Sequence, residues 1–303
     1  MSSSKLPTGA AVLFFASLAF GGFVLGGELE RVTHDGLKKI SPSYVDGGAS
    51  IVYCVHDIPY RVTFVRRNLA DDKVERLLPT VETHQFGGTL SKDGGYLAYA
   101  RSSSSPQLQL VIIDLKEKTE AVFSPLGGRA TLRNPAFSAN GRRVAFSDSG
   151  GTYGQQIATV DLKAQDIKRL TNSAGINPAP KYSPDGKRIV FASSRDGNLE
   201  VYVMDTDGAN QVRLTESEGL DTHPVWSPNG KQIAFTSNRD GNYEIYVMSA
   251  DGSGARNVTK NPERDDFATW HPDGKRLLFV SERAGRFDLY LVTLGAGSVA
   301  AAK

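Results

Sequence analysis

The chain has 303 residues, 40% of them hydrophobic, so it can bury a sizeable core within one domain. Lysine plus arginine (35) nearly balances aspartate plus glutamate (33), and the charges are interspersed, which argues against a nucleic-acid partner. The single cysteine excludes an internal disulfide framework.

The N-terminal segment is predicted to direct export. Lys5 is followed by an uncharged, apolar stretch from residue 6 to residue 27, the order found in secretory signal peptides. The stretch is also about long enough to cross a bilayer. We therefore assign residues 1–27 to a signal peptide or N-terminal membrane anchor, and expect the protein to be exported and either periplasmic or secreted. Contact with a membrane is expected only through this segment, if it is not cleaved.

The remainder of the chain carries a repeat of about 45 residues. Its clearest copies read Ser-Pro-Asp-Gly-Lys-Arg-Ile-Val-Phe from Ser183, Ser-Pro-Asn-Gly-Lys-Gln-Ile-Ala-Phe from Ser227 and His-Pro-Asp-Gly-Lys-Arg-Leu-Leu-Phe from His271. A glycine five residues before an aromatic residue recurs at positions 48, 94, 141, 186, 230 and 274. Because Asp-Gly and Asn-Gly favour tight hairpin turns, each copy is predicted to contain one such turn between two strands.

Each copy is predicted to contain four strands. In the fifth copy a short strand at 224–226 precedes the turn, a β-rich run at 232–236 follows it, and further strands are expected at 244–248 and 256–259. Four strands per repeat of this length are typical of a propeller blade. The predicted fold class is therefore an all-β, six-bladed propeller of four-stranded antiparallel blades.

The two ends of the repeat array predict how the ring closes. Residues 30–33 read as an edge strand with no blade before it, and the last copy stops after its third strand, near Leu294. We expect the N-terminal strand to complete the sixth blade, because closure removes an exposed sheet edge. The propeller is thus assigned to residues 28–294, with a flexible tail at 295–303, and a monomer is expected.

The blocks at 227–248 and 183–204 resemble the WD40-like propeller repeats of the TolB family. In the fifth copy the second half of the block reads Ser-Asn-Arg-Asp-Gly-Asn-Tyr-Glu-Ile-Tyr-Val-Met, and the resemblance extends over residues 130–294. It implies a periplasmic, non-enzymatic protein whose propeller docks a partner lipoprotein at the cell envelope. TolB proteins also carry an α/β domain before the propeller, for which we find no room in this chain.

One face of the predicted propeller is the candidate binding surface. It is formed by the loops from each outer strand to the next inner strand and by the loops between second and third strands, and we name it the loop face. It gathers four of the five histidines together with acidic and basic residues, namely His34, His56, His84, Arg195, Asp221, His223, Arg239, Asp265, Asp266 and Arg283. The alternative interpretation is that these are solvated loop residues, with the Arg-Asp-Gly pieces serving as turns. We expect an envelope protein as partner, with a cell-wall glycan or peptide as the alternative ligand.

No catalytic constellation is found in the sequence. Asp148-Ser149-Gly150-Gly151 resembles the nucleophile segment of trypsin-like proteases, but no matching histidine and aspartate accompany it, and a flexible loop is the better interpretation. No Gly-x-Ser-x-Gly elbow and no His-x-His pair occur, so neither a hydrolase site, a metal nor another cofactor is predicted. The favoured function is a non-enzymatic, protein-binding scaffold. The alternative is a carbohydrate-active lyase or glycosidase that uses histidines at the channel mouth and a metal.

Overall fold

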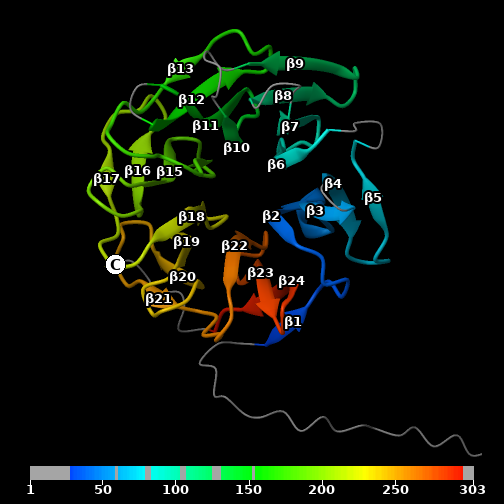
Figure 1. Cartoon of the computed structure of the whole chain (residues 1–303), viewed down its shortest axis with the longest axis vertical. Helices are drawn as coiled ribbons and strands as arrows, with labels where there is room; N and C mark the ends of the chain where they lie inside the picture. Colours follow the sequence, from blue (N-terminus) through cyan, green and yellow to red (C-terminus); the bar gives the residue numbers. More distant parts are fainter. Residues whose placement is uncertain are drawn as a thin grey trace, which may run out of the picture.

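The computed structural model describes residues 28–58, 61–78, 83–102, 107–124, 131–151 and 154–295. In this part of the chain, six four-stranded antiparallel sheets stand around a central channel (Figure 1). The predicted six-bladed propeller is therefore confirmed. The predicted signal peptide or anchor lies outside the described residues, as does all of the predicted tail after Gly295.

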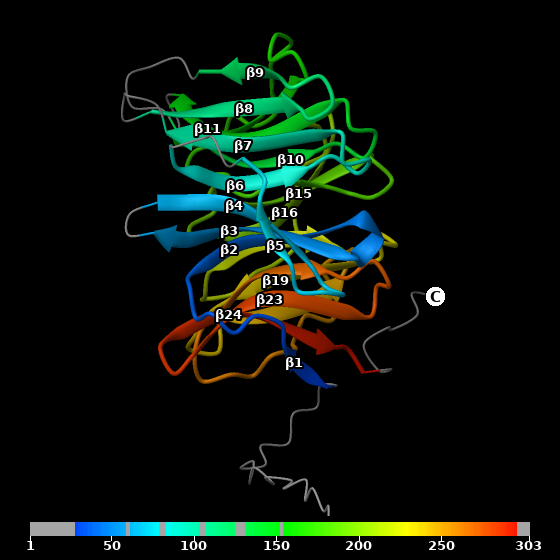
Figure 2. The same ribbon diagram turned by 90° about the vertical axis from the view of Figure 1, so that its right-hand side faces the viewer.

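Each blade contributes one strand to each of four concentric layers around the channel (Figure 1), and Figure 2 shows the ring from its side. The inner strands line the channel and are β2 (Lys39–Val45), β6 (Gln85–Leu90), β10 (Leu132–Phe137), β14 (Lys181–Tyr182), β18 (Asp221–Trp226) and β22 (Asp265–Trp270). The second strands are β3 (Ser50–Ile58), β7 (Tyr96–Ser102), β11 (Arg143–Gly151), β15 (Arg188–Ser193), β19 (Gln232–Ser237) and β23 (Arg276–Arg283).

The third strands follow the second ones through short connections: β4 (Arg61–Asn68), β8 (Leu108–Asp114), β12 (Gly154–Asp161), β16 (Glu200–Asp205), β20 (Glu244–Ser249) and β24 (Arg286–Thr293). The outer strands are β5 (Val74–Arg76), β9 (Thr119–Phe123), β13 (Lys168–Arg169), β17 (Val212–Arg213), β21 (Arg256–Asn257) and, for the sixth blade, β1 (Leu29–Arg31). One turn of 3-10 helix, Asp46–Gly48, connects β2 to β3.

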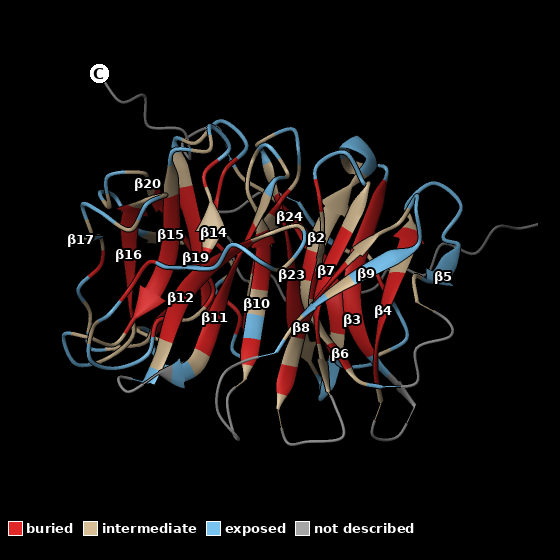
Figure 3. Ribbon diagram, turned by 90° about the horizontal axis from the view of Figure 1, so that it is seen from above, coloured by how far each residue is buried: buried red, intermediate tan, exposed pale blue. Residues whose placement is uncertain are grey.

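The core lies between neighbouring blades and is built from the second and third strands. Figure 3 shows burial concentrated in these layers, whereas the outer strands β5 and β9 are largely exposed. The aromatic residue that marks each repeat is buried in every blade, at Tyr53, Tyr99, Phe146, Phe191, Phe235 and Phe279. Cys54 is also buried, next to the first of them on β3. The repeat is therefore maintained by packing, because each ring fills the space between two sheets.

The Ser-Pro-Asp-Gly segment forms the predicted turn between inner and second strands. In the fourth blade, Ser183 Oγ accepts a hydrogen bond from the Arg188 amide (2.9 Å), and its carbonyl accepts one from the Gly186 amide (2.9 Å). The Asp185 side chain accepts a hydrogen bond from the Lys187 amide (3.1 Å). Gly186 has φ of 71°, a left-handed conformation that glycine adopts without steric cost. We name the face formed by these turns the turn face; it lies opposite the loop face.

Ring closure occurs as predicted, because β1 pairs antiparallel with β24. Just beyond β1, Thr33 Oγ1 donates to Asp288 Oδ1 (2.7 Å) and accepts the Leu289 amide (2.9 Å). Arg31 Nη2 donates to Asp288 Oδ2 (2.6 Å). The two ends of the propeller are thus held by strand pairing and by a buried carboxylate.

The same contact recurs inside the three preceding blades. The threonine that follows the outer strand donates to an acceptor at or near the start of the third strand, in the pairs Thr171–Gln156, Thr215–Glu200 and Thr259–Glu244. Closure of the sixth blade therefore reproduces, across the chain ends, a contact that is local elsewhere. This explains why residues 30–33 could be identified as an edge strand from the sequence.

Candidate functional site

The arginines predicted on the loop face are engaged within their own blades. The guanidinium groups of Arg195, Arg239 and Arg283 lie 4.8 to 4.9 Å from the ring centres of Tyr202, Tyr246 and Tyr290, respectively. Such cation-π contacts stabilise the loop between second and third strands. Arg239 also forms an ion pair with Asp221, whose side chain is fully buried.

The other residues of the Arg-Asp-Gly-Asn motif have partners of the same internal kind. In the fifth blade, Tyr246 donates its hydroxyl proton to Asp240, and the Asn242 amide donates to the carbonyls of Asn261 and Glu263 (2.7 and 2.9 Å). Gly241 has φ of 109°, which side chains strongly disfavour. In the fifth blade the motif thus forms contacts within the blade and with the loop that leads into the sixth blade.

We expect Tyr246→Phe to lower the free energy of unfolding by about 1 kcal/mol, because it removes a hydrogen bond to a carboxylate. Tyr290→Phe is the matched control: Tyr290 stacks with Arg283 in the same way, but its hydroxyl has no hydrogen-bond partner among the described residues. The control should leave the unfolding midpoint in urea unchanged. Equal losses in both variants would show that the Asp240 contact does not contribute.

The predicted aspartates Asp221 and Asp265 are buried at the start of consecutive inner strands, β18 and β22. Asp265 Oδ1 accepts hydrogen bonds from Ser281 Oγ (2.6 Å) and the Asn261 amide (3.1 Å), while its Oδ2 has no partner. Burial raises the pKa of Asp265 to about 6 and also raises the pKa of Asp221.

The fourth blade carries Asn177 at the position that Asp221 and Asp265 occupy. Its Oδ1 accepts from Ser193 Oγ (2.7 Å) and Arg195 Nη2 (3.1 Å), so a neutral amide performs the same structural task. Sequence reasoning missed Asn177, although it lies 44 residues before Asp221, one repeat period earlier.

Asp266 and His223 form a cluster at the channel wall. His223 Nδ1 lies 2.8 Å from Asp266 Oδ1, and Thr236 Oγ1 donates to the same oxygen (2.9 Å). Arg264 pairs with the second oxygen of Asp266. The pKa of Asp266 is lowered: its burial alone would raise the pKa, but His223 and Arg264 stabilise the carboxylate and outweigh that effect.

The histidines of the loop face do not converge on one point. His34 and His56 are exposed, and His84 is partly buried beside the Val62 amide, from which its Nδ1 accepts a hydrogen bond (3.3 Å). His223 lies in β18, on a different blade. Among the described residues, no group of three histidines, cysteines or carboxylates is close enough to hold a metal ion.

The segment Asp148-Ser149-Gly150-Gly151 belongs to strand β11, so the prediction of a flexible loop is wrong. Asp148 pairs with Arg169 of the outer strand (3.2 Å). Ser149 Oγ accepts a hydrogen bond from the Thr131 amide (2.7 Å). This contact extends the pairing of β11 with β10, the inner strand of the third blade, by one residue. A polar Asp-Ser-Gly stretch does not reveal such pairing from local sequence alone.

The central channel contains a cavity of about 340 Å³, lined by residues from all six inner strands. The cavity also reaches the turns at residues 92, 138, 184 and 228, and therefore extends toward the turn face. Its volume lies within the range of about 300 to 1,000 Å³ found for small-molecule pockets. Trp226 and Trp270 form part of its wall and also pack in the core.

An irregularity at one position of each repeat shapes this wall: the inner strands β2, β6, β10, β18 and β22 each carry a register shift there, and in blade four the position lies just before β14. One residue per blade has φ between 49° and 58°, at Ser41, Gly87, Asn134, Ala179, His223 and Phe267. For the five residues other than glycine this conformation is unfavourable, so its recurrence at one repeat position identifies it as a built-in feature. The residue two positions later lines the cavity in every blade: Ser43, Thr89, Ala136, Lys181, Val225 and Thr269.

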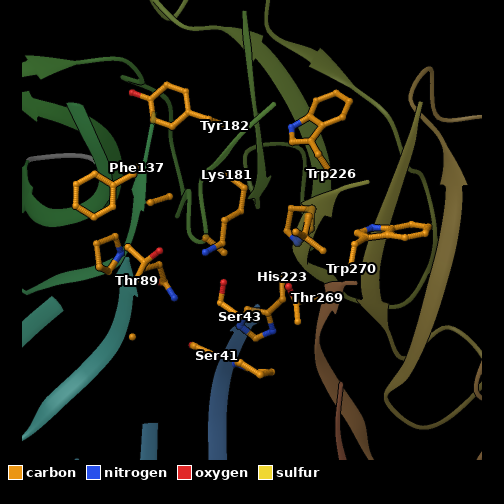
Figure 4. A pocket seen from close by; sticks show the side chains of 18 of the residues that line it. Ser41, Ser43, Thr89, Phe137, Lys181, Tyr182, His223, Trp226, Thr269 and Trp270 are labelled. Carbon is orange, nitrogen blue, oxygen red and sulfur yellow. The ribbon is translucent and has the colours of Figure 1, made fainter. Parts of the chain in front are cut away.

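Lys181 is the residue of that ring which sequence reasoning missed. Figure 4 shows its side chain extending into the cavity from β14. Burial lowers its pKa to about 8. The signal was present in the sequence, because the position five residues before the repeat glycine holds a small or β-branched residue in the other five copies.

Comparison with known proteins identifies the family. The TolB beta propeller domain matches residues 126–301, more than half of the chain. The chain belongs to this family of propellers. Within curated sequences, the TolB-family chain is similar to the Tol-Pal system protein TolB of Francisella tularensis subsp. mediasiatica, with 35% identity over 77 residues. That match covers 24% of this chain and only 17% of the relative.

Solved structures show the same fold for this TolB propeller. TolB from Acinetobacter baumannii superposes with a TM-score of 0.66 and 22% identity, over 82% of this chain and 64% of that one. An oligogalacturonate lyase in complex with manganese superposes with a TM-score of 0.59 and 16% identity, over 90% and 94% of the two chains. At these identities the likeness concerns the fold, which serves both binding proteins and enzymes.

Proposed function

We propose that this TolB-like propeller is a non-enzymatic, extracytoplasmic scaffold that binds a protein partner at the cell envelope. Membership of the TolB propeller family is the observation that supports it, and a Tol-Pal system protein is among its relatives. A cell-wall glycan or peptide is the alternative ligand.

The proposed location is the periplasm or the external medium, reached through the N-terminal segment. Among the described residues, no helix is long and apolar enough to cross a membrane. We propose a monomer, in which residues 1–27 supply any contact with the membrane.

The proposed partner surface is the loop face, and its test must avoid the residues that hold the blades together. Reversing the charge of Arg239 would leave the buried carboxylate of Asp221 unpaired and disturb the fold. His34, His56 and Glu218 are exposed residues of this face and are better suited to substitution.

We expect His34→Asp/His56→Asp/Glu218→Arg to abolish capture of an envelope partner in chemical crosslinking followed by mass spectrometry. The matched control reverses three exposed lysines at equivalent positions on the turn face, in Lys187→Glu/Lys231→Glu/Lys275→Glu, and should capture the partner as the wild type does. Loss of capture only in the control would show that the partner binds the turn face instead. Absence of any specific partner for the wild-type protein would contradict the scaffold function.

A propeller carbohydrate-active enzyme is the second candidate, supported by the fold shared with the oligogalacturonate lyase. The discriminating measurement combines metal analysis of the purified protein with an assay on acidic oligosaccharides, in the presence and absence of added manganese. Turnover that is lost in His56→Ala would establish this function in place of the scaffold.

A further inference from the structure

Lys181 breaks the pattern of the ring that lines the channel. The equivalent residues of the other five blades are Ser43, Thr89, Ala136, Val225 and Thr269, all small or of medium size and none of them charged. The repeat therefore does not require a lysine there. A long cationic side chain at one of six equivalent positions calls for an explanation by function.

The ammonium group of Lys181 has no hydrogen-bond or ion-pair partner among the described residues. Protein atoms of the cavity wall displace water from this ammonium group and so lower its pKa, and no neighbouring carboxylate raises the pKa again. An unpaired charge in such an environment is unfavourable, so proteins seldom keep one without a ligand or a catalytic task.

The rest of the cavity is matched to an anion. None of the described residues lining it is acidic. Besides Lys181, its titratable members are Lys92, where the cavity reaches the turn face, Tyr182, and His223, whose ring pairs with Asp266. Hydroxyl groups come from Ser41, Ser43, Thr89 and Thr269 (Figure 4). The described lining around Lys181 thus offers hydroxyl donors and no carboxylate that would repel an anion.

We propose that the central channel binds a carboxylate group attached to an apolar body, with Lys181 as its counter-ion. A single ammonium neutralises a single negative charge, which favours a carboxylate over a doubly charged phosphate. The rings of Phe137, Tyr182, Trp226 and Trp270 and several prolines offer apolar surface for the body of the ligand. The site goes beyond the scaffold function and does not depend on it, because a free acid and an acidic group of a peptide would make the same contact.

The charge state of Lys181 gives the site a pH signature. With a pKa of about 8, the free side chain loses its charge as the pH rises above 8, and the affinity for a carboxylate should fall in the same range. Binding at pH 8 to 9 should also take up a proton, because the bound carboxylate favours the ammonium form. Calorimetry in two buffers of different ionisation enthalpy measures this uptake.

The test is isothermal titration of the full chain with N-acetyl-phenylalanine, which bears an α-carboxylate, and with N-acetyl-glutamyl-phenylalaninamide, which bears a side-chain carboxylate. The neutral control is N-acetyl-phenylalaninamide. We expect at least one acid to bind at least tenfold more tightly than the neutral amide, since a hydrogen bond to a charged group contributes about that much. Which acid binds more tightly distinguishes a free terminus or small acid from an acidic side chain.

Lys181→Met should remove this preference, whereas Lys187→Met, at an exposed turn position, should keep it. Folding of Lys181→Met can be checked independently, because losing an unpaired cation should raise its Tm at pH 7 above that of the wild type, with the difference shrinking between pH 8 and 10.5. Equal affinity for acid and amide, undiminished acid binding by Lys181→Met, or no binding of either acid at 10 mM would overturn the proposal.

Discussion

Asp288→Ala is expected to cost about 3 to 5 kcal/mol of unfolding free energy, the range for breaking a buried ion pair by removing one partner. Asp288 is buried and lies at the junction of the two chain ends, where it accepts hydrogen bonds from Thr33 and Arg31. Its Oδ1 also lies 3.5 Å from the ammonium group of Lys39, whose side chain is fully buried. Removing the carboxylate leaves Lys39 with Asp35 as its remaining ion-pair partner. It also removes the hydrogen bonds that Arg31 and Thr33 make to the sixth blade through this carboxylate.

Asp288→Asn separates the two parts of this effect. The amide oxygen can still accept the hydroxyl of Thr33, but the negative charge facing Arg31 and Lys39 is lost, so an intermediate loss of stability is expected. Urea denaturation, followed by circular dichroism, measures both variants. A cost below about 1 kcal/mol for Asp288→Ala would mean that strand pairing alone holds the ring closed.

The fold could be predicted because every blade repeats the same local chemistry. Asp-Gly turns are readable from three or four residues, and the buried aromatic residue follows each turn at a fixed distance, as Gly186 and Phe191 show. The closure could also be predicted, because Arg31-Val32-Thr33 has the composition of Arg213-Leu214-Thr215, the outer-strand segment of blade four. In both cases local sequence determines the contacts.

The candidate site could be predicted only in part, because it depends on which way side chains point. Arg195, Arg239 and Arg283 lie at or next to the loops between second and third strands, but their stacking on tyrosines of the third strand is set by the sheet register. The channel wall was harder still. Its shape follows from six left-handed positions, of which only Gly87, Asn134 and His223 hold residue types that favour such a backbone. Without these positions, the side chain of Lys181 cannot be assigned to the cavity.

Asp265→Asn is expected to stabilise the protein above pH 6. The pKa of Asp265 is about 6 in the folded protein, against 3.8 for an unperturbed aspartate, because the carboxyl group is buried. The folded state therefore binds more protons than the unfolded state between pH 3.8 and 6, and stability falls as the pH rises through this window. The full loss amounts to about 3 kcal/mol, and asparagine at this position would avoid it.

The adjacent Asp266 provides a control with the opposite sign. Its pKa is lowered by His223 and Arg264, so its ionised form stabilises the fold, and this contribution is lost as the pH falls. Asp266→Asn should therefore weaken the protein at pH 7, while Asp265→Asn strengthens it. Urea denaturation of both variants at pH 4 and pH 7.5 tests the pair. A loss of stability for Asp265→Asn at pH 7.5 would show that the attraction between Arg283 and the Asp265 carboxylate contributes more free energy than burying that charge costs.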